Sequence, residues 1–241
     1  MNLLVSIPMP SGEHPSAGLA ALVLLVVLIV MAVGYVSRAA PRGRFTISNT
    51  RAVRAAADGV KYRVHPGHDD AGAAAETMAE LNRRSVELMR YLRDKYLRRP
   101  GSSPARARAV RRLLGLYNPD NLAENSPRDP EGDTSYTVDK GAILALCLRE
   151  KDPGRTGGAG VHDIHDLNTL TFVTLHELTH IAIEDTGHPP QFWQTFKFIL
   201  RDAVSGAGLL AGVDYSRHPT VYCGMSIDYN PLYDDSLPAL V

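Results

Sequence analysis

The chain has 241 residues, in which 26 Lys and Arg balance 26 Asp and Glu. This length allows one sizeable hydrophobic core, and the absence of internal repeats or long low-complexity tracts excludes a repeat architecture. The neutral total conceals two oppositely charged parts: residues 37–112 carry 18 basic and 7 acidic residues (+11), whereas residues 113–241 carry 8 and 18 (−10).

The N-terminal part contains one long apolar segment. Ala17 to Val36 is a run of 20 residues without charge, long enough to cross about 30 Å of hydrocarbon as a helix. The preceding residues 1–16 contain no Lys or Arg, unlike the basic start of a cleaved signal peptide. We therefore predict a transmembrane helix at 17–36 behind a short extracytoplasmic N-terminus, and the alternative is a cleaved signal peptide.

The charges that flank this segment predict its orientation. Three arginines follow it within eight residues, and a glutamate precedes it. The positive-inside rule then predicts a single-pass membrane protein whose C-terminal 200 residues are cytoplasmic. Cys147 and Cys223 fit a reducing compartment, and Cys147 is predicted to be a buried thiol because it lies in an apolar run. A disulfide between the two cysteines would require the opposite orientation.

Residues 37–112 form a basic juxtamembrane region. A helix is predicted from about residue 69 to 98, and an Arg-rich stretch follows at 105–114. Three interpretations of this region are open, in our order of preference: contact with an anionic lipid surface, a solvated face, and nucleic-acid binding. No nucleic-acid fold motif is present, and no aromatic residues interleave with the arginines.

Residues 113–241 are predicted to form the main domain. Alternation over 134–138 and the apolar run at 142–148 predict two strands. Pro, Gly, Asp and Asn are frequent at 118–134 and 151–160, which favours surface loops. Either strand could pair with an extended ligand or serve only as an ordinary strand of the core.

The most informative motif is H-E-x-x-H at His176, Glu177 and His180. Residues four apart share one face of a helix, so the two histidines can bind one zinc ion with the glutamate beside it. The apolar spacing from Asp166 onward predicts that helix, and Gly187 can end it in a left-handed conformation. The alternative is that both histidines are hydrogen-bonded core residues.

A catalytic zinc usually has three protein ligands, and we predict His188 as the third. A continued helix would carry His188 roughly 12 Å beyond His180, so the chain must turn back between them. Gly187 and the two prolines that follow His188 favour this reversal. Glu184 and Asp185 are competing ligands, because carboxylates also bind zinc.

These residues carry a family resemblance. HELTHIAIEDTGHPPQFW (176–193) resembles the WLM and SprT-like zinc metallopeptidases, in which H-E-x-x-H precedes a Gly-His-x-x-x-Phe element. TSYTVDKGAILALCLR (134–149) and YCGMSIDYNPL (222–232) resemble the same group, in particular membrane-anchored proteins of large DNA viruses and protists. The resemblance covers roughly residues 115–232. It implies His176, His180 and His188 as ligands of one Zn²⁺ and Glu177 as the catalytic acid/base.

The predicted fold is α+β, a small zincin-like domain with a mixed sheet and an active-site helix behind the transmembrane helix. The expected function is zinc-dependent hydrolysis of peptide bonds in a protein or peptide substrate, with Glu177 as general base. Three alternatives are open: a catalytically silent, zinc-stabilised binding protein at a membrane, a hydrolase of other bonds, and a DNA-associated protease acting on crosslinked proteins, which the resemblance suggests.

Overall fold

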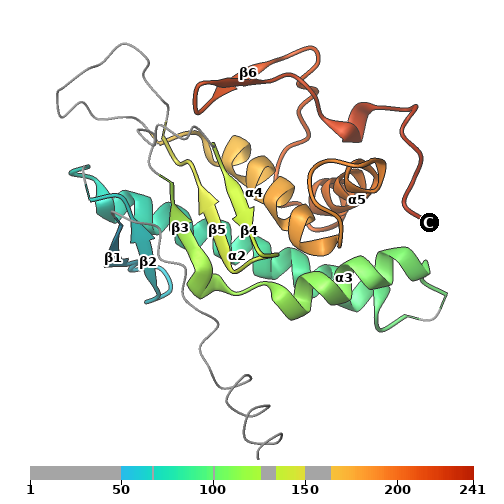
Figure 1. Cartoon of the computed structure of the whole chain (residues 1–241), viewed down its shortest axis with the longest axis horizontal. Coiled ribbons are helices and arrows are strands. Elements are labelled where there is room, and N and C mark those ends of the chain that lie inside the picture. The colour runs from blue at the N-terminus through green and yellow to red at the C-terminus, as the bar shows by residue number, and fades with distance from the viewer. Residues whose placement is uncertain (1–49, 67, 100, 126–133, 150–163) are drawn as a thin grey trace, which may run out of the picture. The chain divides into compact units, whose positions relative to one another are not determined.

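Helices and a mixed β-sheet make up the part of the chain that the computed structural model describes, residues 50–66, 68–99, 101–125, 134–149 and 164–241. All of these residues belong to one unit, Phe45–Val241. Figure 1 shows the sheet with helices packed against it. The predicted α+β class with a mixed sheet is confirmed.

The sheet has five short strands in the order β1-β2-β3-β5-β4. The strands are β1 (Arg51–Arg54), β2 (Lys61–Val64), β3 (Leu122–Glu124), β4 (Tyr136–Val138) and β5 (Ile143–Leu146). β3 is parallel to both of its neighbours, whereas the outer pairs β1–β2 and β4–β5 are antiparallel. β5 is buried throughout, and β4, which is the outermost strand in this order, is only half-buried. The two predicted strands are therefore confirmed, with β4 at the edge.

Four helices accompany the sheet: α2 (Ala71–Tyr96), α3 (Pro104–Leu116), α4 (Leu167–Ala182) and α5 (Pro190–Arg201). Buried positions of α2 recur every three or four residues, so one apolar face packs on the sheet and on α4. They include Met78, Leu81, Ser85, Leu88 and Leu92. α3 begins after Ser103, whose hydroxyl accepts a hydrogen bond from the Arg106 backbone N–H, and Pro104 is the first helical residue.

Buried residues on both sides of positions 112 and 113, where the sequence changes charge, belong to one core. These positions fall inside α3, and buried residues of α2 and α3 belong to the same apolar cluster as those of α4 and α5. Part of the basic charge also serves this fold, because Arg84 pairs with Glu80 and donates to the backbone oxygen of Leu209. The described residues of both oppositely charged parts therefore belong to one unit.

A buried ion cluster joins the sheet to the start of α2. The Arg149 side chain is fully buried, and its guanidinium donates to Glu124 at 2.9 Å and to Asp70 at 2.7 Å. The second Glu124 oxygen accepts a hydrogen bond from the His65 backbone N–H at 2.7 Å. Because an unpaired charge in the core is costly, these groups hold β2, β3 and the end of β5 together with α2.

The predicted transmembrane helix at 17–36 lies outside the described residues. In the part of the chain that the structure describes, no helix is both long and apolar enough to cross a membrane. α2 has 26 residues but carries many charges, and the apolar α4 has 16, about 24 Å against about 30 Å of hydrocarbon. We therefore correct two predictions: the transmembrane helix in the fold class and the single-pass, cytoplasmic-domain localisation.

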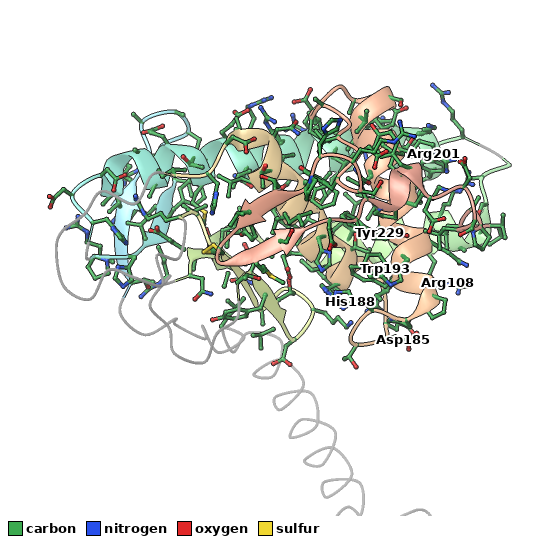
Figure 2. All side chains as sticks on the ribbon, turned by 90° about the horizontal axis from the view of Figure 1, so that it is seen from above. Arg108, Asp185, His188, Trp193, Arg201 and Tyr229 are labelled. Carbon is green, nitrogen blue, oxygen red and sulfur yellow. A yellow bond between two sulfur atoms is a disulfide. The ribbon has the colours of Figure 1, made fainter. Side chains whose placement is uncertain are left out.

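A hairpin of β6 (Thr220–Tyr222) and β7 (Met225–Ile227) is fixed to the end of β5. Figure 1 shows it in red above the sheet. Cys223, in its turn, forms a disulfide with Cys147, drawn in yellow in Figure 2. The Tyr222 hydroxyl donates to the Cys147 backbone oxygen at 2.8 Å and lies 2.6 Å from Ser135 Oγ. The hairpin is thus attached by a covalent bond and by hydrogen bonds at one place.

The disulfide corrects the prediction of a buried thiol at Cys147. Disulfides persist mainly in oxidising environments, so the cysteines no longer support a reducing compartment. Cys147 is fully buried and Cys223 is 2 % exposed, so the bond lies within the core.

Replacing both Cys147 and Cys223 by Ser should lower the free energy of unfolding by about 2–5 kcal/mol, because the bond closes a loop across 76 residues in the unfolded chain. Urea denaturation of the full chain measures the change. Reductant should destabilise the parent by a similar amount and leave the double variant unaffected. Equal stability of the oxidised parent and the variant would contradict this role.

Candidate metal centre

Helix α4 places two histidines of the predicted motif on one face. The helix begins after Asp166, whose carboxylate accepts a hydrogen bond from the Thr169 backbone N–H at 2.9 Å. The His176 and His180 rings follow at four-residue spacing, with centroids 5.1 Å apart. The predicted helix is confirmed, although it ends at Ala182, five residues before Gly187.

Polar residues in the buried part of α4 are satisfied within the helix. The hydroxyls of Thr171, Thr174 and Thr179 each donate to the backbone oxygen four residues earlier, at 2.6–2.8 Å. Such bonds allow threonine to be buried without an unpaired hydroxyl. The helix can therefore be covered on several sides while the histidine face stays open to a cleft.

His188 returns to the same place from the loop between α4 and α5. Gly187 has φ +68°, a left-handed conformation that favours glycine, and α5 starts at Pro190. The ring centroid of His188 lies 4.9 Å from those of both His176 and His180. The structure thus brings all three predicted ligands together.

The loop that carries His188 is exposed, and neighbouring side chains hold it. The His188 ring stacks on Trp193 with centroids 5.5 Å apart, as the labelled side chains in Figure 2 illustrate. Lys140, in the β4–β5 turn, donates to the backbone oxygen of Asp185. Arg112 of α3 donates to the backbone oxygen of Ile183 at 3.2 Å. These contacts fix the return of the chain from α4 to His188.

The three imidazoles fit a zinc ion. One ring nitrogen from each lies within 4.8 Å of the others, and the Nε2 atoms of His176 and His188 are 2.9 Å apart. Around a tetrahedral zinc, nitrogens at about 2.0–2.1 Å from the metal are separated by roughly 3.3 Å. Burial, together with the neighbouring imidazoles, lowers the pKa of His176 to about 3 and, with a further contribution from Lys140, that of His180 to about 4. The rings are therefore neutral near pH 7, as metal ligation requires.

The competing carboxylates take no part in this cluster. Glu184 and Asp185 are exposed, and Glu184 lies 3.2 Å from the Arg112 guanidinium. Within the described ranges, the group of side chains with metal-binding spacing consists of the three histidines.

Glu177, next to His176 on α4, contacts the sheet. Its side chain is buried, and its Oε2 atom accepts a hydrogen bond from Thr137 Oγ1 of β4 at 2.9 Å. This contact joins residues 40 positions apart and orients the carboxylate relative to the edge strand. The sequence offered no signal for Thr137, because its role depends on how the sheet packs on α4.

A cleft of about 830 Å³ opens over the histidines and Glu177. β4 and the β4–β5 turn form one wall, β7 and the residues after it form another, and α4 and α5 contribute the remainder. Tyr222 and Met225, which the sequence left without a role, both line this cleft. The Tyr222 hydroxyl already donates to the Cys147 backbone oxygen, so this side chain anchors the hairpin.

The fold and site define a class: an α+β protein with a three-histidine candidate metal centre and a buried glutamate beside it. Neither a protein-family model nor a solved structure matches the chain. It is 34% identical over 155 residues to uncharacterized protein R325 of Acanthamoeba polyphaga mimivirus, which covers 64% of this chain and 71% of that protein. The chain therefore belongs to the family of this mimivirus protein.

Two further relatives are iridescent-virus proteins. Uncharacterized protein 136R of Invertebrate iridescent virus 6 is 38% identical over 97 residues, or 40% of this chain and 49% of its own length. Uncharacterized protein 042R of Invertebrate iridescent virus 3 is 38% identical over 82 residues, which are 33% of this chain and 46% of that protein. The matches therefore span about half of each iridescent-virus protein.

Replacing His188 by Ala should lower the affinity for zinc by more than about 100-fold. Removing a residue that only contacts a metal ligand already lowers metal affinity by about 10–100-fold, and His188 is predicted to be a ligand itself. Competition of the full chain with a coloured zinc chelator measures this affinity. Glu184→Ala and Asp185→Ala serve as matched controls in the same loop and should keep the parent affinity. A carboxylate variant that loses zinc while His188→Ala keeps it would reverse the ligand assignment.

Proposed function

We propose that this protein is a zinc-dependent endopeptidase of the same class as the WLM and SprT-like metallopeptidases. One observation carries the proposal: a buried glutamate, held by Thr137 of an edge strand, stands beside three clustered imidazoles in an open cleft. A purely structural zinc site usually closes its fourth position with Cys or His and has no use for such a carboxylate.

Each residue of the site has a separate role in the proposed reaction. His176, His180 and His188 would hold the zinc, which supplies a Lewis acid that polarises the substrate carbonyl and acidifies water. Glu177 accepts a proton from a water molecule while the oxygen of that water forms a bond to the carbonyl carbon of the substrate. The same carboxyl then gives this proton to the amine nitrogen as the C–N bond breaks. Thr137 keeps the carboxylate oriented through both transfers.

The shape of the cleft favours an extended peptide as substrate. β4 is the outermost strand of its sheet and lines the cleft, with Glu177 in contact with its middle residue. A strand at a sheet edge can align an extended chain through backbone hydrogen bonds, largely independently of side-chain sequence. A peptide along β4 would bring a backbone carbonyl to the histidine cluster.

Replacing Glu177 by Gln should leave zinc binding near the parent level and lower peptide hydrolysis by roughly 10²–10⁴-fold, the usual contribution of a general acid/base. Thr137→Val should cause a smaller loss of about tenfold, because the carboxylate stays but loses an orienting hydrogen bond. Zinc content and casein cleavage are measured on the same preparations of full-length protein.

Asp185→Ala provides a control that changes an exposed carboxylate near the site without touching Glu177. A parent that binds zinc but cleaves neither casein nor mixed peptides would contradict the peptidase proposal and favour a zinc-stabilised binding protein. Full activity in Glu177→Gln would show that another group moves the proton.

A further inference from the structure

The two faces of the β6–β7 hairpin meet different surroundings. Residues directly opposite each other in a hairpin share a face, so Tyr222 and Met225 lie on one face and Val221 and Ser226 on the other. Tyr222 is 2 % exposed, which fixes its face toward the protein. Met225 shares this face and lines the cleft, yet it is 51% exposed. Met225 is therefore an apolar residue of the cleft lining that protein groups leave half uncovered.

Aromatic and aliphatic side chains of the helices line the same cleft. Trp193 of α5 lines it together with buried Phe172 and Val173 of α4 and Phe196 of α5. The Trp193 ring contacts Tyr229, which follows β7, edge-on at 5.2 Å between centroids. Figure 2 shows Tyr229, Trp193 and His188 in succession along this side of the molecule. The apolar lining thus extends from α5 to the strand β7.

This apolar lining begins at the metal centre. The His176 ring lies 5.3 Å from that of Phe196 and 6.4 Å from that of Trp193, between centroids. A substrate residue next to the bond that is cleaved would therefore place its side chain among these groups. Four charged residues line the cleft: Asp139 and Lys140 lie in the β4–β5 turn, Glu177 lies on α4, and exposed Asp228 follows β7. Asp228, the one that lies next to β7, disfavours an acidic substrate side chain at this place.

We propose that β7 and α5 form a subsite for a large apolar side chain of the substrate, adjacent to the cleaved bond, and that Met225 is a specificity-determining residue of this subsite. The inference rests on the proposed peptidase function and adds a substrate preference to it. Leu, Met or Phe finds apolar partners on both walls, whereas Glu or Asp would lose water among these apolar groups and would approach Asp228.

Peptide binding can be measured directly, because Trp193 is the single tryptophan of the chain and its fluorescence reports from the cleft. The probes are Trp-free peptides of Ala and Ser that differ at one central position, Phe against Glu. They are titrated into zinc-loaded, full-length Glu177→Gln protein, so that binding is observed without turnover. We expect the Phe peptide to bind at least about tenfold more tightly, the discrimination that an apolar pocket provides.

Two variants of the hairpin form a matched pair in this background. Met225→Ser should remove most of the preference for Phe, whereas Val221→Ser should retain it, because Val221 is 61% exposed on the opposite face. Equal affinity for the Phe and Glu peptides, or an equal loss in both variants, would overturn the subsite.

Cleavage of a mixed peptide pool by the parent separates this inference from the peptidase proposal. Cleavage without enrichment of large apolar residues beside the cut would overturn the subsite and leave the peptidase standing. Selective binding of the Phe peptide without any cleavage by the parent would overturn the peptidase and support the subsite as a binding groove.

Discussion

The burial of helix α4 is the constraint on which the rest of the structure depends. It packs against α2, α3, α5 and β4, and 12 of its 16 residues are buried. A helix covered on most sides cannot rotate without disrupting several contacts, so the histidine face is fixed toward the cleft. Buried threonines remain compatible with this environment because their hydroxyls bond back to the helix. The candidate site is thus a direct consequence of core packing.

The third histidine is held in a different way. His188 lies in an exposed loop, so packing alone cannot position it; stacking on Trp193 and the hydrogen bonds from Lys140 and Arg112 to this loop do so. A site with two rigid ligands and one on a tethered loop links metal binding to the order of that loop. The β6–β7 hairpin is similarly tethered, by the Cys147–Cys223 disulfide, on the other side of the cleft. Both tethered segments frame the place where a substrate would bind.

Local patterns in the sequence were enough to predict the helix that carries His176 and His180 and the two strands before it. Apolar spacing, apolar/polar alternation and the His176–His180 interval are short-range signals, and the structure confirms the elements that they predict. Interactions between segments far apart in the sequence could not be predicted from such local patterns. Examples are the hydrogen bond between Thr137 and Glu177, 40 residues apart, and the disulfide between Cys147 and Cys223, 76 residues apart. The change in charge near residue 112 likewise carried no information on packing, because the apolar faces of α2 and α3 join the same core as those of α4 and α5.

X-ray absorption spectroscopy of the zinc-loaded, full-length protein tests the central claim most directly, because it reads the atoms bound to the metal. We predict a spectrum with three imidazole nitrogens at about 2.0–2.1 Å and one further light-atom ligand. The imidazole contribution should fall to two in His188→Ala at saturating zinc. A sulfur ligand near 2.3 Å, or a parent spectrum with fewer than three imidazoles, would contradict the assignment of His176, His180 and His188 as the metal centre.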